Sequence, residues 1–232
     1  MPIHVKARAS GLDRSRHAAP QVFEQLRAMI LSLEMAPGTV LSRAELAGLF
    51  GLSQTPIRDA LIKLGEAGLV DIFAQHATLV SRIDLASARQ VHFLRKCIEL
   101  EVVRTLAAAP AAELVARLRA QIDLQVAVMS ADDFSAFVAA DLAFHHMMYE
   151  AAGAAELSDH VRQLSGHIDR LRRLHLPDAG KAQAVVRDHK RIVDAIAKGD
   201  PELAQQRVRE HLSGTLAKVD EISARYPQYV TR

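Results

Sequence analysis

Four residues in the second half of the chain have the types and the spacing of a metal-binding cluster. Asp141 and His145 are four positions apart in an apolar stretch, so on a helix both side chains leave from one face. A buried carboxylate beside imidazoles is costly unless it is paired or bound to a cation. His189 and His211, from two later segments, complete a set of one carboxylate and three imidazoles. This set suits a divalent ion, with zinc as first choice and nickel, manganese or iron as further choices.

The spacing alone leaves other interpretations open. Each histidine can instead satisfy its own hydrogen bonds at a helix interface, in a domain that serves only for dimerisation. His146 competes as a ligand, but on a helix it points about 100 degrees away from His145 and cannot share the face of Asp141. The same cluster with an open coordination position is also compatible with a metal-dependent hydrolase that activates water. Against the hydrolase, no motif places an acid or base beside the four ligands.

A group of residues nearer the N-terminus has the pattern of a helix-turn-helix that reads DNA. Ser42, with Glu45 three residues later, predicts the start of one helix, and Gly51 marks the turn after it. Ser53 and Pro56 predict the start of a second helix. Its apolar residues recur at helical spacing, which leaves polar side chains and an arginine on the opposite face, where they suit base edges and phosphates. The predicted DNA-contacting residues are Arg43, Ser53, Gln54, Thr55 and Arg58.

Residues 20–82 resemble the winged helix-turn-helix of the GntR family of bacterial transcription regulators. The resemblance implies DNA contacts from the start of the second helix and from a wing, built as a short hairpin, whose tip carries His76 as a further candidate. The chain departs from the family at Gln54, where arginine is common, and at Gln75-His76-Ala77, where a glycine-rich turn is usual. The matching residues are Pro37-Gly38, Leu41, Leu46-Ala47, Leu52-Ser53, Thr55-Pro56, Arg58, Ala60-Leu61, Leu64 and Gly68-Leu69.

Residues 85–220 resemble the ligand-binding domain of the FadR branch of that family, the FCD domain. The resemblance implies that Arg95 points into the cavity of a small carboxylate effector. On spacing alone, an ion pair between Arg95 and Glu99 one turn later is an equally good interpretation. The family commonly has Gly-Asn where this chain has Gly153-Ala154. The resemblance also implies that a metal is held by Asp141, His145, His189 and His211.

Composition sets outer bounds on the class of protein. The 232 residues suffice for two domains with separate cores. Half of the residues are hydrophobic, but no run reaches the roughly 18 apolar residues of a membrane span, and the N-terminus has no apolar signal segment. We therefore expect a cytoplasmic protein. The single cysteine, Cys97, excludes an internal disulfide and is expected to be a buried structural thiol.

The predicted fold class is mostly α, with a winged helix-turn-helix followed by an all-helical bundle of six to seven helices. The segment 81–84 is the predicted joint between the two parts. The helices of the bundle are expected over about 84–109, 110–130, 133–153, 155–175, 178–199 and from 200 onward. The predicted domains are a flexible basic arm at 1–17, the winged domain at 18–82, the effector-binding and dimerisation domain at 83–226, and a tail at 227–232.

These patterns together predict a metabolite-responsive transcription regulator, with repression as the expected mode. A homodimer presents two recognition helices to adjacent half-sites of double-stranded operator DNA. A small organic acid that binds one arrangement of the bundles better than the other changes the spacing of those helices, and so the affinity for the operator.

Overall fold

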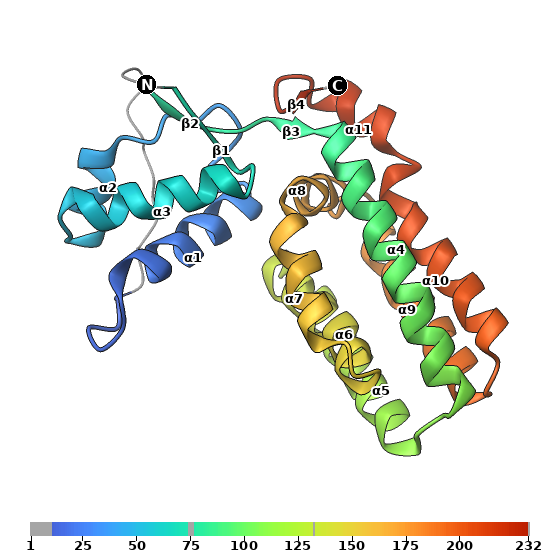
Figure 1. The fold of residues 1–232 in the computed structure, drawn as a ribbon. Coiled ribbons are helices and arrows are strands. Elements are labelled where there is room, and N and C mark those ends of the chain that lie inside the picture. Colours follow the sequence, from blue (N-terminus) through green and yellow to red (C-terminus); the bar gives the residue numbers. More distant parts are fainter. Residues whose placement is uncertain (1–10, 74–76, 132, 232) are drawn as a thin grey trace. The chain divides into compact units, whose positions relative to one another are not determined.

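The computed structural model describes residues 11–73, 77–131 and 133–231, and most of these residues are helical (Figure 1). The chain forms two compact units, each assembled from segments that are far apart in the sequence. The winged unit contains the residues before Arg89, residues 166–173 and the residues from Ser223 onward. The helical unit contains Arg89–Ser165 and Leu174–Ile222. The predicted mostly α fold is confirmed.

The winged unit begins with a helix-turn-helix and a hairpin, as the sequence predicts. Both α1 and α2 pack against α3, and their apolar faces form one core with the start of the hairpin. The two strands of the hairpin are antiparallel, with Val70 opposite Val80. The elements are α1 (Ala18–Leu31), α2 (Arg43–Phe50), α3 (Gln54–Glu66), β1 (Val70–Ile72) and β2 (Thr78–Val80).

The predicted end signals of α2 and α3 are largely as expected. The hydroxyl of Ser42 accepts a hydrogen bond from the Glu45 amide at 3.3 Å, which caps α2. Gly51 ends α2 with a left-handed backbone, φ +64°, which glycine adopts without steric cost. The prediction for Ser53 is wrong in one respect, because its side chain makes no capping hydrogen bond although it stands at the N-cap of α3. Its backbone there is extended, as a cap position requires.

The predicted joint at residues 81–84 is held by two segments from much later in the chain. Strand β3 (Ile83–Asp84) pairs in parallel with β4 (Val230–Thr231) near the C-terminus. Helix α8 (Gly166–His175) contributes His167, whose Nδ1 accepts a hydrogen bond from the Asp84 amide at 3.0 Å. Residues 81–84 therefore lie inside the winged unit, and the boundary between the two compact units falls after Ala88.

A fully buried arginine fixes α8 to this joint. Arg170 donates to the Ser81 carbonyl at 2.6 Å and to the Ser81 hydroxyl at 3.2 Å. The same hydroxyl donates to the Gly68 carbonyl at 2.7 Å, so Ser81 links the helix to the end of the helix-turn-helix. Burial lowers the pKa of Arg170 to about 10, and the guanidinium is held in place by hydrogen bonds to neutral groups.

The helical unit is a bundle with a core of aliphatic residues and few aromatics. Helix α5 packs against α6 and α9, and α9 packs against α10. Short turns join the helices, and the side chains of Asp133 and Asp200 cap the first turns of α6 and α10, close to where the sequence predicts these helices to begin. The helices of this part are α4 (Leu85–Ala108), α5 (Ala112–Ser130), α6 (Phe134–Ala151), α7 (Ala155–Leu164), α9 (Lys181–Ala197), α10 (Pro201–Leu216) and α11 (Val219–Arg225).

Three details of the predicted helical part are wrong. The helix expected over 155–175 is divided at Ser165 into α7 and α8, because α8 packs on the winged unit, where Gly166 lets Leu69 approach. A Cβ on Gly166 would lie 2.6 Å from Leu69 Cδ2, so glycine is required for this approach. The helix expected from residue 178 begins at Lys181 instead, as α9, and its N-cap is Gly180 with φ +78°. Cys97 is exposed rather than buried.

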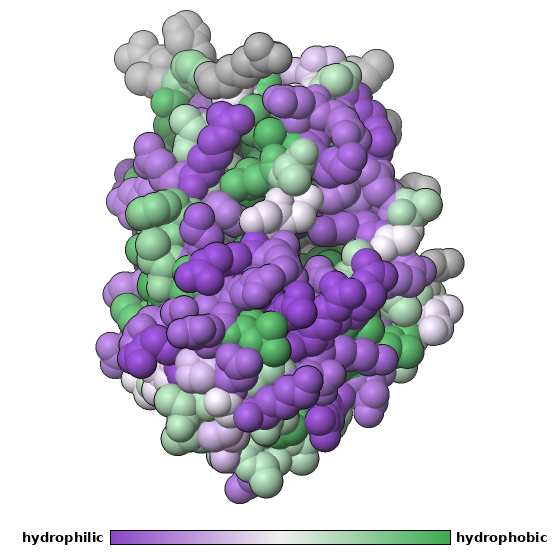
Figure 2. Space-filling model, turned by 90° about the vertical axis from the view of Figure 1, so that its right-hand side faces the viewer, coloured by the Kyte–Doolittle hydropathy of each residue, from purple (hydrophilic) through white to green (hydrophobic). Residues whose placement is uncertain are grey.

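The surface gives no sign of a membrane-spanning element. Within the described ranges, no helix is both long and apolar enough to cross a membrane. Hydrophilic residues cover most of the face drawn in Figure 2, and hydrophobic residues lie between them in separate patches.

The hydrogen bonds of Ser81 lead to a prediction about stability. We expect Ser81→Ala to lower the free energy of unfolding by about 1 to 3 kcal/mol, because it leaves the Gly68 carbonyl and one Arg170 donor without their partner. Urea denaturation followed by circular dichroism measures the change. Ser53→Ala is the control, since the exposed Ser53 makes no capping bond. Equal midpoints for both variants would contradict the proposed role of the Ser81 hydroxyl.

Candidate functional site

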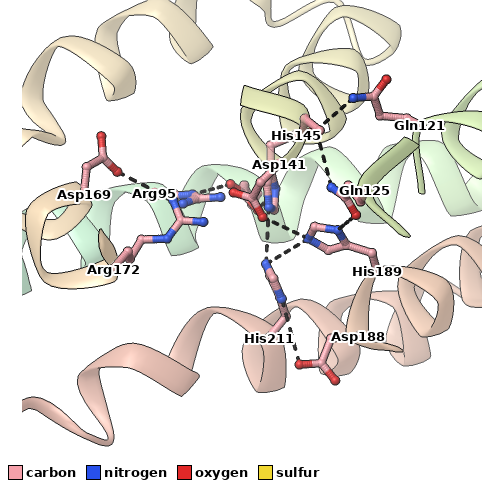
Figure 3. A network of polar contacts seen from close by, with 12 residues as sticks. Arg95, Gln121, Gln125, Asp141, His145, Asp169, Arg172, Asp188, His189 and His211 are labelled. Atoms are coloured by element: carbon pink, nitrogen blue, oxygen red, sulfur yellow. Dashed lines mark hydrogen bonds and ion pairs between the residues drawn. The ribbon is translucent and has the colours of Figure 1, made fainter. Parts of the chain in front are cut away.

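The four predicted metal ligands lie together in the helical unit and point toward a common centre (Figure 3). Helix α6 supplies Asp141 and His145 from one face, α9 supplies His189 and α10 supplies His211. All four side chains are buried. The competing candidate, His146, instead contacts Ser158 and Glu150 at the edge of α6. The structure therefore brings the four predicted residues together and leaves His146 outside their group.

The separations of the facing atoms match those around one ion. The Nε2 atom of His211 lies 3.2 Å from Nε2 of His145 and 3.3 Å from Nε2 of His189. Nε2 of His189 lies 3.5 Å from Oδ1 of Asp141. Adjacent donor atoms bound about 2.0 to 2.2 Å from a shared ion are about 3.0 to 3.5 Å apart. All four atoms lie within 4.8 Å of one another, so they are grouped closely enough for a shared ion.

The outer nitrogen of His189 shows which ring nitrogen carries the proton. Gln125 is fully buried, and its amide nitrogen faces the Ala140 carbonyl at 3.3 Å, where it must donate. Its Oε1 therefore faces Nδ1 of His189, at 2.8 Å, and accepts a hydrogen bond from it. Nε2 of His189 is left with a lone pair directed at the centre. Phe144 stacks on this ring with centroids 4.0 Å apart, which fixes its plane.

The same reasoning applies to His145. Its Nδ1 lies 3.0 Å from Oε2 of Glu99, although neither atom has a hydrogen bond of good geometry among the described residues. Because a carboxylate only accepts protons, a hydrogen on Nδ1 is the tautomer that suits this contact, and it leaves the lone pair on Nε2. Two imidazole lone pairs and a carboxylate oxygen of Asp141 thus face one another inside a protein core. Nε2 of His211 lies within 3.3 Å of both imidazoles and as a donor can satisfy one of them at a time, whereas a cation at the centre would satisfy all of these groups together.

His211 is electrostatically suited to the same role. Burial first, and then the neighbouring His189 and His145, push the pKa of His211 well below its usual value, so the ring is neutral at pH 7. A metal ligand must be neutral imidazole. Its outer nitrogen, Nδ1, lies 4.0 Å from Asp188 Oδ2, which is too long for a direct hydrogen bond.

Arg95 and Glu99 form a buried ion pair one turn apart on α4, with Nε 2.6 Å from Oε1. Burial raises the pKa of the Glu99 carboxyl, but the charges of Arg95 and then His145 outweigh this effect and hold the pKa at about 2. The pKa of Arg95 is raised, because Glu99 and then Asp141 together outweigh its desolvation. The pair that spacing suggested is present, and it also lies beside the candidate metal ligands.

Three buried neighbours of the site were not predicted as site residues. Glu99 was considered only as a partner of Arg95, and Gln125 carries no local signal because its partner is 64 positions away. Tyr149 could have been found, since it follows His145 by one turn on the ligand face of α6. Its hydroxyl is buried and makes no hydrogen bond with the described residues. Burial and then the charge of Glu99 raise the pKa of Tyr149.

The predicted DNA-contacting residues lie on the surface of the winged unit. Ser53, Gln54 and Thr55 are exposed at the first turn of α3, with Arg58 one turn later. Arg58 forms a weak exposed pair with Asp59 at 3.5 Å, so its guanidinium can reorient toward another partner. Arg43 is exposed at the start of α2. His76 lies outside the described residues.

Comparison with known families divides the chain in the same order as the structure. Residues 18–80 match the family described as "Bacterial regulatory proteins, gntR family", and residues 90–214 match the FCD domain. The first match covers the helix-turn-helix and the hairpin. The second covers more than half of the chain and contains every proposed metal ligand.

The relatives are named as transcription regulators. An HTH-type regulator from an unstable DNA locus of Streptomyces ambofaciens is 36% identical over 89% of this chain and 87% of its own length. The repressor RspR of Escherichia coli is 28% identical over 91% of this chain and 92% of its own length. These names decide against the alternative of a metal-dependent hydrolase.

Solved structures show the same fold at low sequence identity. McbR/YncC of E. coli superposes with a TM-score of 0.75 at 17% identity, covering 91% of this chain and 99% of the other. A transcriptional regulator from Rhodococcus sp. RHA1 gives a TM-score of 0.70 at 21% identity, covering 87% of this chain and 96% of the other.

The convergence of the four ligands leads to a prediction about metal content. We expect the purified protein to retain one divalent ion per chain, and His189→Ala to lose it, because the substitution removes a ligand and its bond to Gln125. Elemental analysis after dialysis measures the stoichiometry. His146→Ala, on the edge of α6, is the control and should keep the ion. Full metal content in His189→Ala would remove His189 from the ligand set.

Proposed function

Because this chain belongs to the GntR family of bacterial regulatory proteins and carries an FCD domain, we propose that it is a metabolite-responsive transcriptional repressor. In the proposal, the helical domain binds a divalent metal and a small carboxylate effector, and the winged domain binds operator DNA. The observation that carries it is the convergence of Asp141, His145, His189 and His211 in a chain that also exposes a recognition helix. Repression is favoured by the name of RspR.

The proposed metal is zinc first, with nickel, manganese or iron as alternatives, since one carboxylate and three neutral imidazoles suit these ions. When bound, such an ion acts as a Lewis acid whose remaining coordination positions accept a carboxylate oxygen. The buried surroundings of the cluster strengthen any such charge interaction.

The proposed effector contact is Arg95. It uses Nε for Glu99, and the described residues provide no second ion pair for its remaining donors. A guanidinium with two free nitrogens at its end is a bidentate partner for a carboxylate. Since Arg95 also influences Asp141 electrostatically, an acid bound between it and the metal would interact with both cations.

The proposed mechanism requires a homodimer. Two recognition helices reach adjacent half-sites of a pseudo-palindromic operator only when two chains associate. Helix α4 carries Phe93, 63% exposed, and Leu94, 38% exposed, next to each other, and we propose that this apolar surface contributes to the dimer contact. Effector binding then acts by favouring one arrangement of the two chains over another.

Arg58 provides the test of DNA binding. We expect Arg58→Ala to weaken operator binding by about 1 to 3 kcal/mol, because an arginine at this position contacts a base or a phosphate. Gel-shift titration with promoter fragments from its own and adjacent operons measures the midpoint. Arg119→Ala is the matched control, since Arg119 is equally exposed and also pairs with an aspartate, but lies on α5. Equal midpoints for both variants would exclude Arg58 as a contact.

Arg95 provides the test of effector binding. We expect one or more small organic acids to raise the melting temperature of the metal-loaded protein, with a smaller rise after chelation. Arg95→Lys keeps the charge beside Glu99 but loses bidentate geometry, so its stabilisation by the acid should shrink. Arg104→Lys, an exposed arginine on the same helix paired with Glu101, is the control. Equal stabilisation of both variants would exclude Arg95 from the effector site.

A further inference from the structure

Glu99 lies between Arg95, the proposed effector contact, and His145, a proposed metal ligand. Its side chain has no exposed surface, and each of its oxygens faces a different partner. Oε1 accepts a hydrogen bond from Arg95 Nε at 2.6 Å, and Oε2 lies 3.0 Å from His145 Nδ1. A buried carboxylate is costly unless it is paired, so these two contacts account for its place in the core.

Glu99 does not belong to the set of metal ligands. The four facing ligand atoms lie within 4.8 Å of one another, and that group does not include Glu99. Its oxygen approaches the Nδ1 nitrogen of His145, which is directed away from the centre, while Nε2 of the same ring faces His211. Glu99 can therefore influence a bound metal only through the His145 ring.

The outer contacts of the three histidines differ in strength. His189 meets a neutral amide oxygen of Gln125 at 2.8 Å, and His211 has Asp188 at 4.0 Å. Of these three outer nitrogens, Nδ1 of His145 is the one that lies within 3.5 Å of a carboxylate oxygen, at 3.0 Å, and a small rotation of either side chain would complete the hydrogen bond. A negatively charged acceptor on Nδ1–H fixes the tautomer, orients the ring and makes Nε2 a stronger donor to a metal. Of the three, His145 is thus the ligand that depends most on its outer partner.

We propose that Glu99 is a positioning residue of the metal centre, which holds His145 in its ligating tautomer while Arg95 holds Glu99. The inference rests on the proposed function, because it assumes that the cluster binds a metal. It gives the Arg95–Glu99 pair a role beyond that of an ion pair within one helix. Removal of the carboxylate should weaken metal binding although every ligand remains.

The test compares Glu99→Gln with wild type and with Glu101→Gln. Glu101 is two residues further along α4, is exposed and pairs with Arg104, so its substitution controls for loss of a carboxylate on this helix. Zinc affinity is measured by competition with a chromophoric chelator. We expect about 10- to 100-fold weaker zinc binding in Glu99→Gln and no change in Glu101→Gln.

A second readout separates positioning from a general loss of structure. In the cobalt(II)-loaded proteins, the visible absorption bands report the geometry of the ligands, and we expect them to differ from wild type only in Glu99→Gln. If this variant does not fold, because Arg95 is left buried without its counter-charge, the double variant Arg95→Met/Glu99→Gln removes both charges. It should fold with the apo melting temperature of wild type and still bind zinc more weakly.

The outcomes distinguish this inference from the proposed function. Wild-type zinc affinity and cobalt spectra in Glu99→Gln would overturn the role of Glu99 and leave the metal centre intact. A wild-type protein that binds neither zinc nor cobalt would overturn the metal centre of the proposed function, and this inference with it.

Discussion

The candidate site of the helical unit depends on the pairing of charged and polar side chains in its interior. Arg95, Glu99, Asp141 and the three histidines lie where water does not reach them, and each such group costs free energy unless a partner of opposite character faces it. Arg95 neutralises Glu99, and the second oxygen of Glu99 faces the ring nitrogen Nδ1 of His145 at 3.0 Å. At the centre the three imidazoles face one another and a carboxylate oxygen of Asp141, at distances of 3.2 to 3.5 Å. The packing of α4, α6, α9 and α10 brings together a site that favours a cation.

Much of this arrangement could be predicted from local spacing. Asp141 and His145 share a face because four residues make about one helical turn, and the capping residues of α2, α6 and α10 mark where those helices begin. That His189 and His211 belong to the same site does not follow from spacing, since their facing depends on how separate helices pack. The family resemblance supplied that part of the prediction.

The contacts that surround the ligands could not be predicted from local sequence patterns either, because they join residues that are far apart in the chain. Gln125 and His189 are 64 positions apart, and Arg170 and Ser81 are 89 apart. The sequence predicts one helix through Ser165, because the helical spacing of apolar residues continues there. In the structure the helix is interrupted at Ser165, and the first residues of α8 belong to the winged unit. Cys97 was predicted to be buried because its helix is apolar, but it is exposed. An apolar helix also contains exposed positions, and composition alone does not tell which they are.

The chain passes twice from the helical unit back to the segment at residues 81–84. The chain leaves the helical unit after Ser165, forms the part of α8 that holds Ser81, and returns at Leu174. After Ile222 it leaves again and ends in β4, which pairs with β3. The joint at residues 81–84 is therefore bonded to two segments whose ends are covalently continuous with the helical unit. Because Arg170 is buried and its bonds to Ser81 are short, a displacement of α8 must either carry the joint with it or break those bonds.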